Sequence, residues 1–278
     1  MKRMRIAGLC LVAVFALTAA FAVSAQAAPE FGQCVAQKKG EYTEGACKTK
    51  SAKPKKGHFE WHAGPAPSCI SVKKGFYSDP GCTTRDEKKG KPKGKYEKAG
   101  GPGFTTAGGA ATLETPAFGA PVTCASNSSV GSVLTATTAT QTITFVGCET
   151  SGKKCNSGGA GTGEIVVKNV QNTLKEQLPG IVGISFASET GPTGIFVTFE
   201  CEGPQIRTKG FVTGVNNGAD LNAMATTGGE KFENSTNDEQ DLETELSVDG
   251  GVTWKGPAPS LQLASGTLTS ASPMEIRF

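Results

Sequence analysis

The sequence predicts a mainly β protein in two parts: a small duplicated, disulfide-stapled N-terminal module, followed by an antiparallel β-sandwich or barrel domain. Three observations lead to this prediction. A short cysteine-bounded segment is written twice, eight cysteines follow residue 27, and short alternating polar and apolar stretches fill the chain from residue 104. Regularly spaced short strands with glycine-rich turns are typical of antiparallel sandwiches and barrels. We therefore divide the chain into 1–27, 28–103 and 104–278.

Residues 1–27 have the features of a signal peptide. Lys2, Arg3 and Arg5 form a basic start, residues 6–22 are almost wholly apolar, and 25–27 read Ala-Gln-Ala, a small-x-small cleavage pattern. A retained membrane anchor is the alternative, but the apolar run is slightly short for a span and no basic stop follows it. We expect cleavage after residue 27, no membrane span in the mature chain, and a secreted or envelope-associated, extracytoplasmic protein.

The N-terminal module, 28–103, contains an internal duplication. In each copy the second cysteine lies thirteen positions after the first, with Lys-Lys-Gly-x-Tyr at matched offsets between them. A unit this small cannot bury a core alone, so a crosslink has to stabilise it. We expect self-contained disulfides. The predicted pairs are Cys34–Cys47 in the first copy and Cys69–Cys82 in the second.

The other four cysteines of the mature chain lie in the second domain. An even number of cysteines in an exported chain favours disulfides over free thiols. Structural zinc is the alternative, but the sequence has no Cys-x-x-Cys pair, and we expect no cofactor. We predict Cys148–Cys155 across a short loop and Cys124–Cys201 between distant strands.

Period-two alternation marks the expected strands of the second domain. In 140–146 the three threonines fall on one face, while Ile143 and Phe145 fall on the other. Residues 216–220, which read Asn-Asn-Gly-Ala-Asp, are expected to form a hairpin turn. The predicted strands are 111–114, 122–125, 132–137, 140–146, 164–170, 194–201, 205–215, 247–254 and 267–278.

One segment, 166–178, fits either a helix or a strand. Val167, Val170, Leu174 and Leu178 recur at helical spacing, and Pro179 follows as a stop. The sequence leaves both readings open at this point.

Several motifs together resemble a known group of proteins. They are the paired cysteines around Gly-x-Tyr, the Gly-x-[Phe/Tyr]-Glu ending of each copy at 57–60 and 94–97, the Ala-Thr-Leu-Glu-Thr run at 111–115, Val-Thr-Cys at 122–124, and the Gly147-Cys148…Cys155 loop that leads into Gly-Glu-Ile at 163–165. The chain is similar to secreted, disulfide-containing β-rich proteins that occur in many copies in soil actinobacteria and have no assigned function. The resemblance implies export and a shared fold, and it carries over no catalytic residue.

Motifs that would indicate catalysis or metal binding are incomplete. The phosphate-loop-like run at 158–163 lacks the Lys-Ser/Thr ending, and the sequence contains no Gly-x-Ser-x-Gly. The acidic stretch 230–249 offers carboxylates of the kind that calcium prefers, but it has no EF-hand spacing. Asp238, Asp241 and Glu243 are weak calcium candidates, and we otherwise expect no metal.

Charge is divided sharply between the two parts. Residues 28–103 carry 16 Lys/Arg and 8 Asp/Glu, a net charge of +8, whereas residues 104–278 carry 9 and 17, a net charge of −8. The basic clusters recur with the duplication, and aromatic rings among them are suited to stacking or cation–π contacts. Two alternatives stay open: the lysines only solubilise the module, or they pair with the acidic domain. The candidate contacts to an anionic ligand are Lys38, Lys39, Lys73, Lys74, Tyr42, Tyr77 and Trp61.

We therefore expect an exported, non-catalytic binding or envelope-associated protein. Its partner would be an anionic cell-envelope polymer or another secreted protein, with no specific nucleic acid. The alternatives are a secreted hydrolase with paired carboxylates and a secreted inhibitor or toxin. For the hydrolase, Glu164, Glu200 and Glu202 are the acids that could converge in a cleft.

Overall fold

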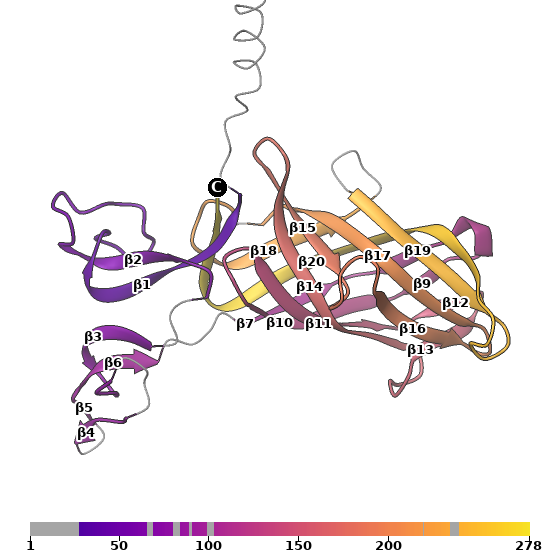
Figure 1. Cartoon of the computed structure of the whole chain (residues 1–278), viewed down its shortest axis with the longest axis horizontal. Helices are drawn as coiled ribbons and strands as arrows, with labels where there is room; N and C mark the ends of the chain where they lie inside the picture. The colour runs from indigo at the N-terminus through magenta and orange to yellow at the C-terminus, as the bar shows by residue number, and fades with distance from the viewer. Residues whose placement is uncertain are drawn as a thin grey trace, which may run out of the picture.

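The computed structural model describes residues 28–65, 69–79, 84–88, 91–98, 103–218, 220–233 and 239–278. These residues form β-strands and one short 3-10 turn, η1 (Pro116–Phe118), with no α-helix among them, so the mainly β prediction is confirmed (Figure 1). The predicted signal peptide lies outside the described residues.

The strands fall into two groups along the chain. Those of the N-terminal region are β1 (Glu30–Gly40), β2 (Gly57–Ala63), β3 (Cys69–Gly75), β4 (Glu87–Lys88), β5 (Lys91–Pro92) and β6 (Gly94–Lys98). Those that follow are β7 (Gly103–Gly108), β8 (Ala111–Glu114), β9 (Val122–Cys124), β10 (Ser126–Val133), β11 (Thr138–Val146), β12 (Glu149–Thr150), β13 (Lys153–Ser157), β14 (Glu164–Leu178), β15 (Ile181–Ala187), β16 (Ile195–Cys201), β17 (Gln205–Asn216), β18 (Ala225–Phe232), β19 (Glu239–Ser247) and β20 (Lys255–Arg277).

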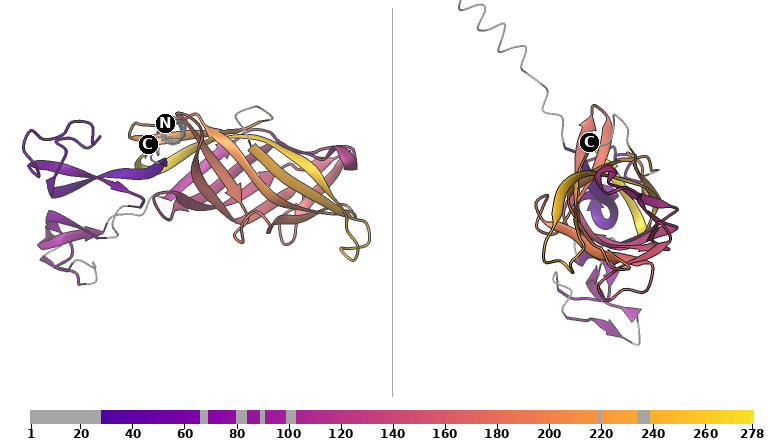
Figure 2. Two further views of the ribbon diagram at one scale, coloured as in Figure 1. Left: turned by 45° about the horizontal axis from the view of Figure 1, so that its top comes forward. Right: turned by 90° about the vertical axis from the view of Figure 1, so that its right-hand side faces the viewer.

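The second group forms one antiparallel sheet that closes on itself. β20 pairs with β7 and β8 along one edge and with β18 and β19 along the other. From β7 the pairing runs through β10, β11, β14 and β15 to β17, which in turn pairs with β18 and β19. The end-on view shows the closed ring (Figure 2). Of the two architectures that the sequence left open, the pairing is that of a barrel, and closure removes the exposed strand edges that a sandwich keeps.

Alternate residues of each strand point into this barrel (residues 103–278), and most of these inward residues are apolar. Along β11, Gln141, Ile143 and Phe145 line the interior, as the alternation predicted. Phe186 and Phe232 are both buried and meet with ring centroids 4.9 Å apart. The lumen is therefore the hydrophobic core of the barrel.

The ambiguous segment 166–178 belongs to the long strand β14, so the helical reading is wrong. Val167, Val170 and Leu174 are all buried, which in a strand requires a break in the two-residue alternation. Asn169 provides it: its φ is +54°, and the pairing with β11 slips by one residue at this point. An extra residue in one strand is a β-bulge, and it turns a period of two into an apparent helical spacing.

Two other predicted strands are displaced. Residues 134–137 form a turn rather than strand, because the Thr135 hydroxyl accepts hydrogen bonds from the backbone N–H groups of Thr137 and Thr138. Residues 248–254 form a loop held by Asp249, which accepts from the Thr253 hydroxyl and backbone and from Ser247. These hydrogen bonds lower the pKa of Asp249. Polar side chains that bond to nearby backbone compete with strand formation.

The two predicted copies in the N-terminal region share a pattern of backbone contacts. In the first repeat (residues 34–60), Tyr42 bridges to Lys50 and to Phe59. In the second repeat (residues 69–97), Tyr77 bridges in the same way to Arg85 and to Tyr96. A second pair of bonds also matches: Thr43 N–H donates to Thr49 O, and Ser78 N–H donates to Thr84 O.

The surroundings of the two repeats differ. β1 pairs with β2 and also with the end of β20, where Glu30 lies opposite Arg277 and Gly32 lies opposite Glu275. The first repeat is therefore continuous with the barrel sheet. β3 and β6 form a separate two-stranded sheet. The division at 103/104 remains a prediction about folding units.

The disulfides confirm one predicted pair and correct two. Cys34–Cys47 is formed as predicted, and Cys82 lies outside the described residues, so Cys69–Cys82 stays a prediction. In the barrel, the predicted pairs Cys148–Cys155 and Cys124–Cys201 are wrong. The bonds are Cys124–Cys148 and Cys155–Cys201.

Strand register explains this connectivity. Cys155 in β13 lies directly opposite Cys201 in β16, so their side chains share one face of the pair. Cys148 meets Cys155 only through the backbone, where the Cys155 N–H donates to the Cys148 carbonyl at 3.0 Å. Nearness in sequence therefore did not place these two sulfur atoms together.

Candidate functional site

The predicted anionic-ligand lysines lie on the surface. Lys38 and Lys39 end β1, Lys73 and Lys74 end β3, and all four are exposed. None of the four forms an ion pair with another described residue, whereas the nearby Lys50 pairs with Glu41 at 3.5 Å. Their charge is available to a ligand.

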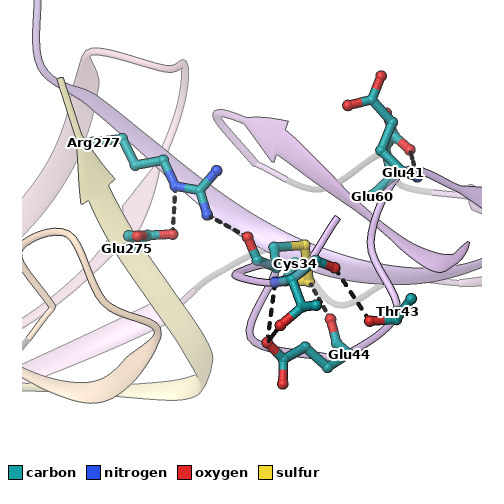
Figure 3. The surroundings of a disulfide bond; sticks show 9 residues. Cys34, Glu41, Thr43, Glu44, Glu60, Glu275 and Arg277 are labelled. Carbon is teal, nitrogen blue, oxygen red and sulfur yellow. Dashed lines mark hydrogen bonds and ion pairs between the residues drawn. A yellow bond between two sulfur atoms is a disulfide. The ribbon is translucent and has the colours of Figure 1, made fainter. Parts of the chain in front are cut away.

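Two of the predicted aromatic contacts are occupied by a residue of the barrel. The Arg277 guanidinium lies 4.7 Å from the Trp61 ring centroid and 5.9 Å from that of Tyr42. It also donates hydrogen bonds to the Cys47 carbonyl at 3.2 Å and to the Glu275 carboxylate at 2.7 Å (Figure 3). These rings join the first repeat to β20, and their contact with a ligand remains a prediction, as does that of Tyr77.

The barrel interior contains a cavity of about 110 Å³. Its lining is mostly apolar and comes from strands all round the ring. Polar side chains on one wall bond to each other: the Ser129 hydroxyl donates to Gln141 Oε1 at 2.7 Å and lies 2.8 Å from the Thr106 hydroxyl. The aromatic lining residues are Phe145, Phe186, Phe196, Phe199 and Phe232.

One acid lies at the wall of this lumen, with a second acid beside it. Glu230, on β18, lines the cavity, and burial followed by repulsion from Asp220 raises its pKa to about 8. Asp220 is only 3% exposed, and burial raises its pKa too. One oxygen of Asp220, Oδ1, is buried without a hydrogen-bond partner among the described residues.

The backbone around Asp220 explains how a carboxyl group came to be buried. Its carbonyl accepts from the N–H of Ile276 at 2.8 Å, which pins the segment after β17 to the end of β20. Its side chain lies against Gly218 and Gly228, where a Cβ would collide with the carboxyl oxygens. The turn predicted at 216–220 lies in the connection between β17 and β18, which pair antiparallel with Asn216 opposite Glu230. The connection is longer than a tight turn, and within it Asp220 also bonds to β20.

Sequence reasoning did not find the Asp220–Glu230 pair. The acids proposed for a hydrolase lie elsewhere: Glu164 accepts from Gly161 N–H and Glu202 from Lys154 N–H, each at 3.1 Å, while Glu200 is exposed. The available signal was the run Gly228-Gly229 before Glu230, since glycines in a strand often mark a close approach of another group.

Two of the three calcium candidates, Asp241 and Glu243, belong to β19. Glu243 pairs with Lys209 at 3.2 Å, Asp241 is exposed, and Asp238 lies outside the described residues. Within the described ranges, no three or more His, Cys, Asp or Glu residues are grouped so that they could hold a metal ion.

No protein-family model, no curated protein and no solved structure matches this chain. In the part of the chain that the structure describes, no helix is both long and apolar enough to cross a membrane. The three disulfides are compatible with an extracytoplasmic location, since such bonds persist in oxidising compartments.

Proposed function

We propose that the chain is an exported, non-catalytic binding protein of the cell envelope, in which two copies of one disulfide-stapled repeat present lysines to an anionic polymer. The supporting observation is the exposure of Lys38, Lys39, Lys73 and Lys74 without ion pairs to other described residues. The matched backbone bonds of Tyr42 and Tyr77 support the duplication. Two similar patches on one chain favour a repeating ligand, because the second contact becomes intramolecular.

The intramolecular alternative, in which the basic module neutralises the acidic barrel, has little support. Every ion pair between described residues joins partners within 28–98 or within 103–278. The contacts that cross include those of Arg277 with the first repeat, the hydrogen bond from Gln33 to Ser272, the Phe31–Ala136 backbone bond, and the β1–β20 pairing. The module's lysines therefore keep their charge for an external partner.

The hydrolase alternative could use the neighbouring carboxyl groups of Asp220 and Glu230. Asp220 is 3% exposed, so it is out of reach of a polymeric substrate. A glycosidase needs both carboxyl groups beside the bond that breaks. The pair therefore favours binding over hydrolysis.

The test measures binding of the purified protein to isolated cell walls from low to high salt. We expect binding at low salt that falls steeply as salt is added, because exposed charges are screened within about 8–10 Å at physiological ionic strength. Salt-insensitive retention, or no binding at low salt, contradicts the proposal.

A matched pair of variants separates this surface from net charge. Replacing Lys38, Lys39, Lys73 and Lys74 by Gln should lower affinity at least tenfold and flatten the salt dependence. The control replaces four barrel lysines that are already ion-paired, so net charge changes equally. These are Lys154, Lys175, Lys209 and Lys231. Equal loss in both variants would show that binding responds to net charge alone.

A further inference from the structure

The barrel lumen is lined by side chains but is not filled by them. About 110 Å³ remains among mostly apolar groups. An apolar cavity of about 150 Å³ engineered into another protein stays dry and accepts benzene, so space of this order suits one small ring or a short chain. On one wall the hydroxyl groups of Thr106 and Ser129 and the Gln141 side-chain oxygen bond to one another.

A second hollow adjoins the lumen. It measures about 590 Å³ and shares two lining residues with the lumen, Glu230 and Ser265. Its walls are largely glycine, with Gly108 and Gly109 from the β7 side and Gly228 and Gly229 from β18. Because glycines carry no side chains, this hollow leads from the surface to Glu230.

We propose that the lumen binds a small apolar molecule carrying one hydrogen-bond acceptor, such as an aldehyde or ketone, which enters through the glycine-lined hollow and meets Glu230. The apolar lining supplies the affinity, and one polar group orients the ligand, which is the usual division in small-molecule sites. This site is separate from the lysine surface and does not depend on it.

The protonation state of Glu230 determines which ligand group it binds, because a protonated carboxyl group can donate its O–H to a hydrogen-bond acceptor of the ligand. Burial and the neighbouring Asp220 raise its pKa to about 8, so at neutral pH the group is largely a neutral acid with an O–H to donate. Glu230 is the one titratable side chain in the described lining of both cavities, and Asp220 is the acid that faces it.

The first experiment uses benzaldehyde and benzene as probes, with binding to the full protein measured by ligand-observed NMR and calorimetry. Ala264→Phe fills the lumen, which Ala264 lines, whereas Val130→Phe adds the same ring to a side chain that is 68% exposed. We expect benzaldehyde to bind the unaltered protein and Val130→Phe equally, and Ala264→Phe at least tenfold more weakly. Thermal unfolding of all three identifies any variant that fails to fold.

Failure of both probes to bind the unaltered protein overturns the proposal, as does equal binding by a folded Ala264→Phe variant. If that variant does not fold, Val197→Leu, which adds one methylene to another lining residue, replaces it and is expected to weaken benzaldehyde binding several-fold.

The second experiment tests the role of Glu230. Glu230→Gln keeps an N–H donor and should keep the preference for benzaldehyde over benzene, while Glu230→Leu should reduce it about three- to tenfold, the range of one net hydrogen bond. In the unaltered protein the preference should fall as pH rises through about 8, because the ionised group can no longer donate. A preference unchanged in Glu230→Leu and at high pH would remove Glu230 from the site.

Discussion

The two predicted repeats of the N-terminal region share local backbone contacts but lie in two different settings. In both, a tyrosine bridges two neighbouring segments, and a glycine lies against the tyrosine's backbone where a Cβ would collide with its carbonyl (Gly57 with Tyr42, Gly94 with Tyr77). In the first repeat, however, β1 extends the edge of β20, and Arg277 of the barrel lies over Tyr42 and Trp61. The second repeat keeps its own two-stranded sheet.

This difference shows that the repeat sequence determines its internal turns, while its coupling to the rest of the molecule depends on what it touches. Glu275 shows the coupling most clearly. Its side chain is only 5% exposed and its charge is met by Arg277, which also reaches the first repeat through the Cys47 carbonyl (Figure 3). We therefore expect damage to the first repeat to reach the barrel, and damage to the second to stay local.

The largest effect is expected from Arg277→Met. It leaves the buried Glu275 carboxylate without its partner and should lower the free energy of unfolding by about 3–5 kcal/mol. Arg85→Met, which removes an exposed pair with Glu87 in the second repeat, should cost no more than about 1 kcal/mol. Urea titrations followed by circular dichroism compare the two, and similar losses would contradict the asymmetry.

Removing the first repeat's disulfide is the next largest change. The double variant Cys34→Ser, Cys47→Ser opens a crosslink with a sequence separation of 13 and should cost about 3 kcal/mol in the chain-entropy account. Because β1 continues into the barrel sheet, the barrel's unfolding midpoint should fall with it. Cys69→Ser, Cys82→Ser is the matched control and should leave that midpoint unchanged. A barrel midpoint that responds equally to both would show that the repeats are coupled alike.

A smaller change compares the two equivalent glycines. Gly57→Ala and Gly94→Ala each force a Cβ against a tyrosine carbonyl, for which overpacking costs of about 1–3 kcal/mol are usual. We expect hydrogen exchange to quicken in β1, β2 and the adjoining end of β20 for Gly57→Ala. For Gly94→Ala the faster exchange should stay within β3 and β6. Faster exchange in β20 caused by Gly94→Ala would count against local containment.

The smallest effect is expected from cutting the chain. The sequence Gly-Gly-Pro-Gly at 100–103 is the predicted first site of limited proteolysis, and residues 104–278 should stay folded afterwards. Because β1 pairs with β20, the two fragments should elute together under native conditions and separate in denaturant. Separation under native conditions would mean that this pairing does not hold the first repeat.

Local rules were enough for much of this protein. The alternation of β11, the bounds of β8, the strand at 195–201 and the Cys34–Cys47 pair all follow from spacing within a few residues. Each depends on side-chain period or on a short loop, which a sequence displays directly. The exposure of the four module lysines follows from the same kind of reasoning.

Only the tertiary structure decided the long-range pairings. The bulge at Asn169 made a strand look helical, because its partner strand lies elsewhere in the sequence. The register between β13 and β16 places Cys155 opposite Cys201, and this determines the disulfide between them. The backbone bond between Asp220 and Ile276, and the glycines that make room for the Asp220 carboxyl, placed this acid beside Glu230 of the lumen wall. Closing a barrel joins residues that are far apart in the chain, and no local period in the sequence records which of them will meet.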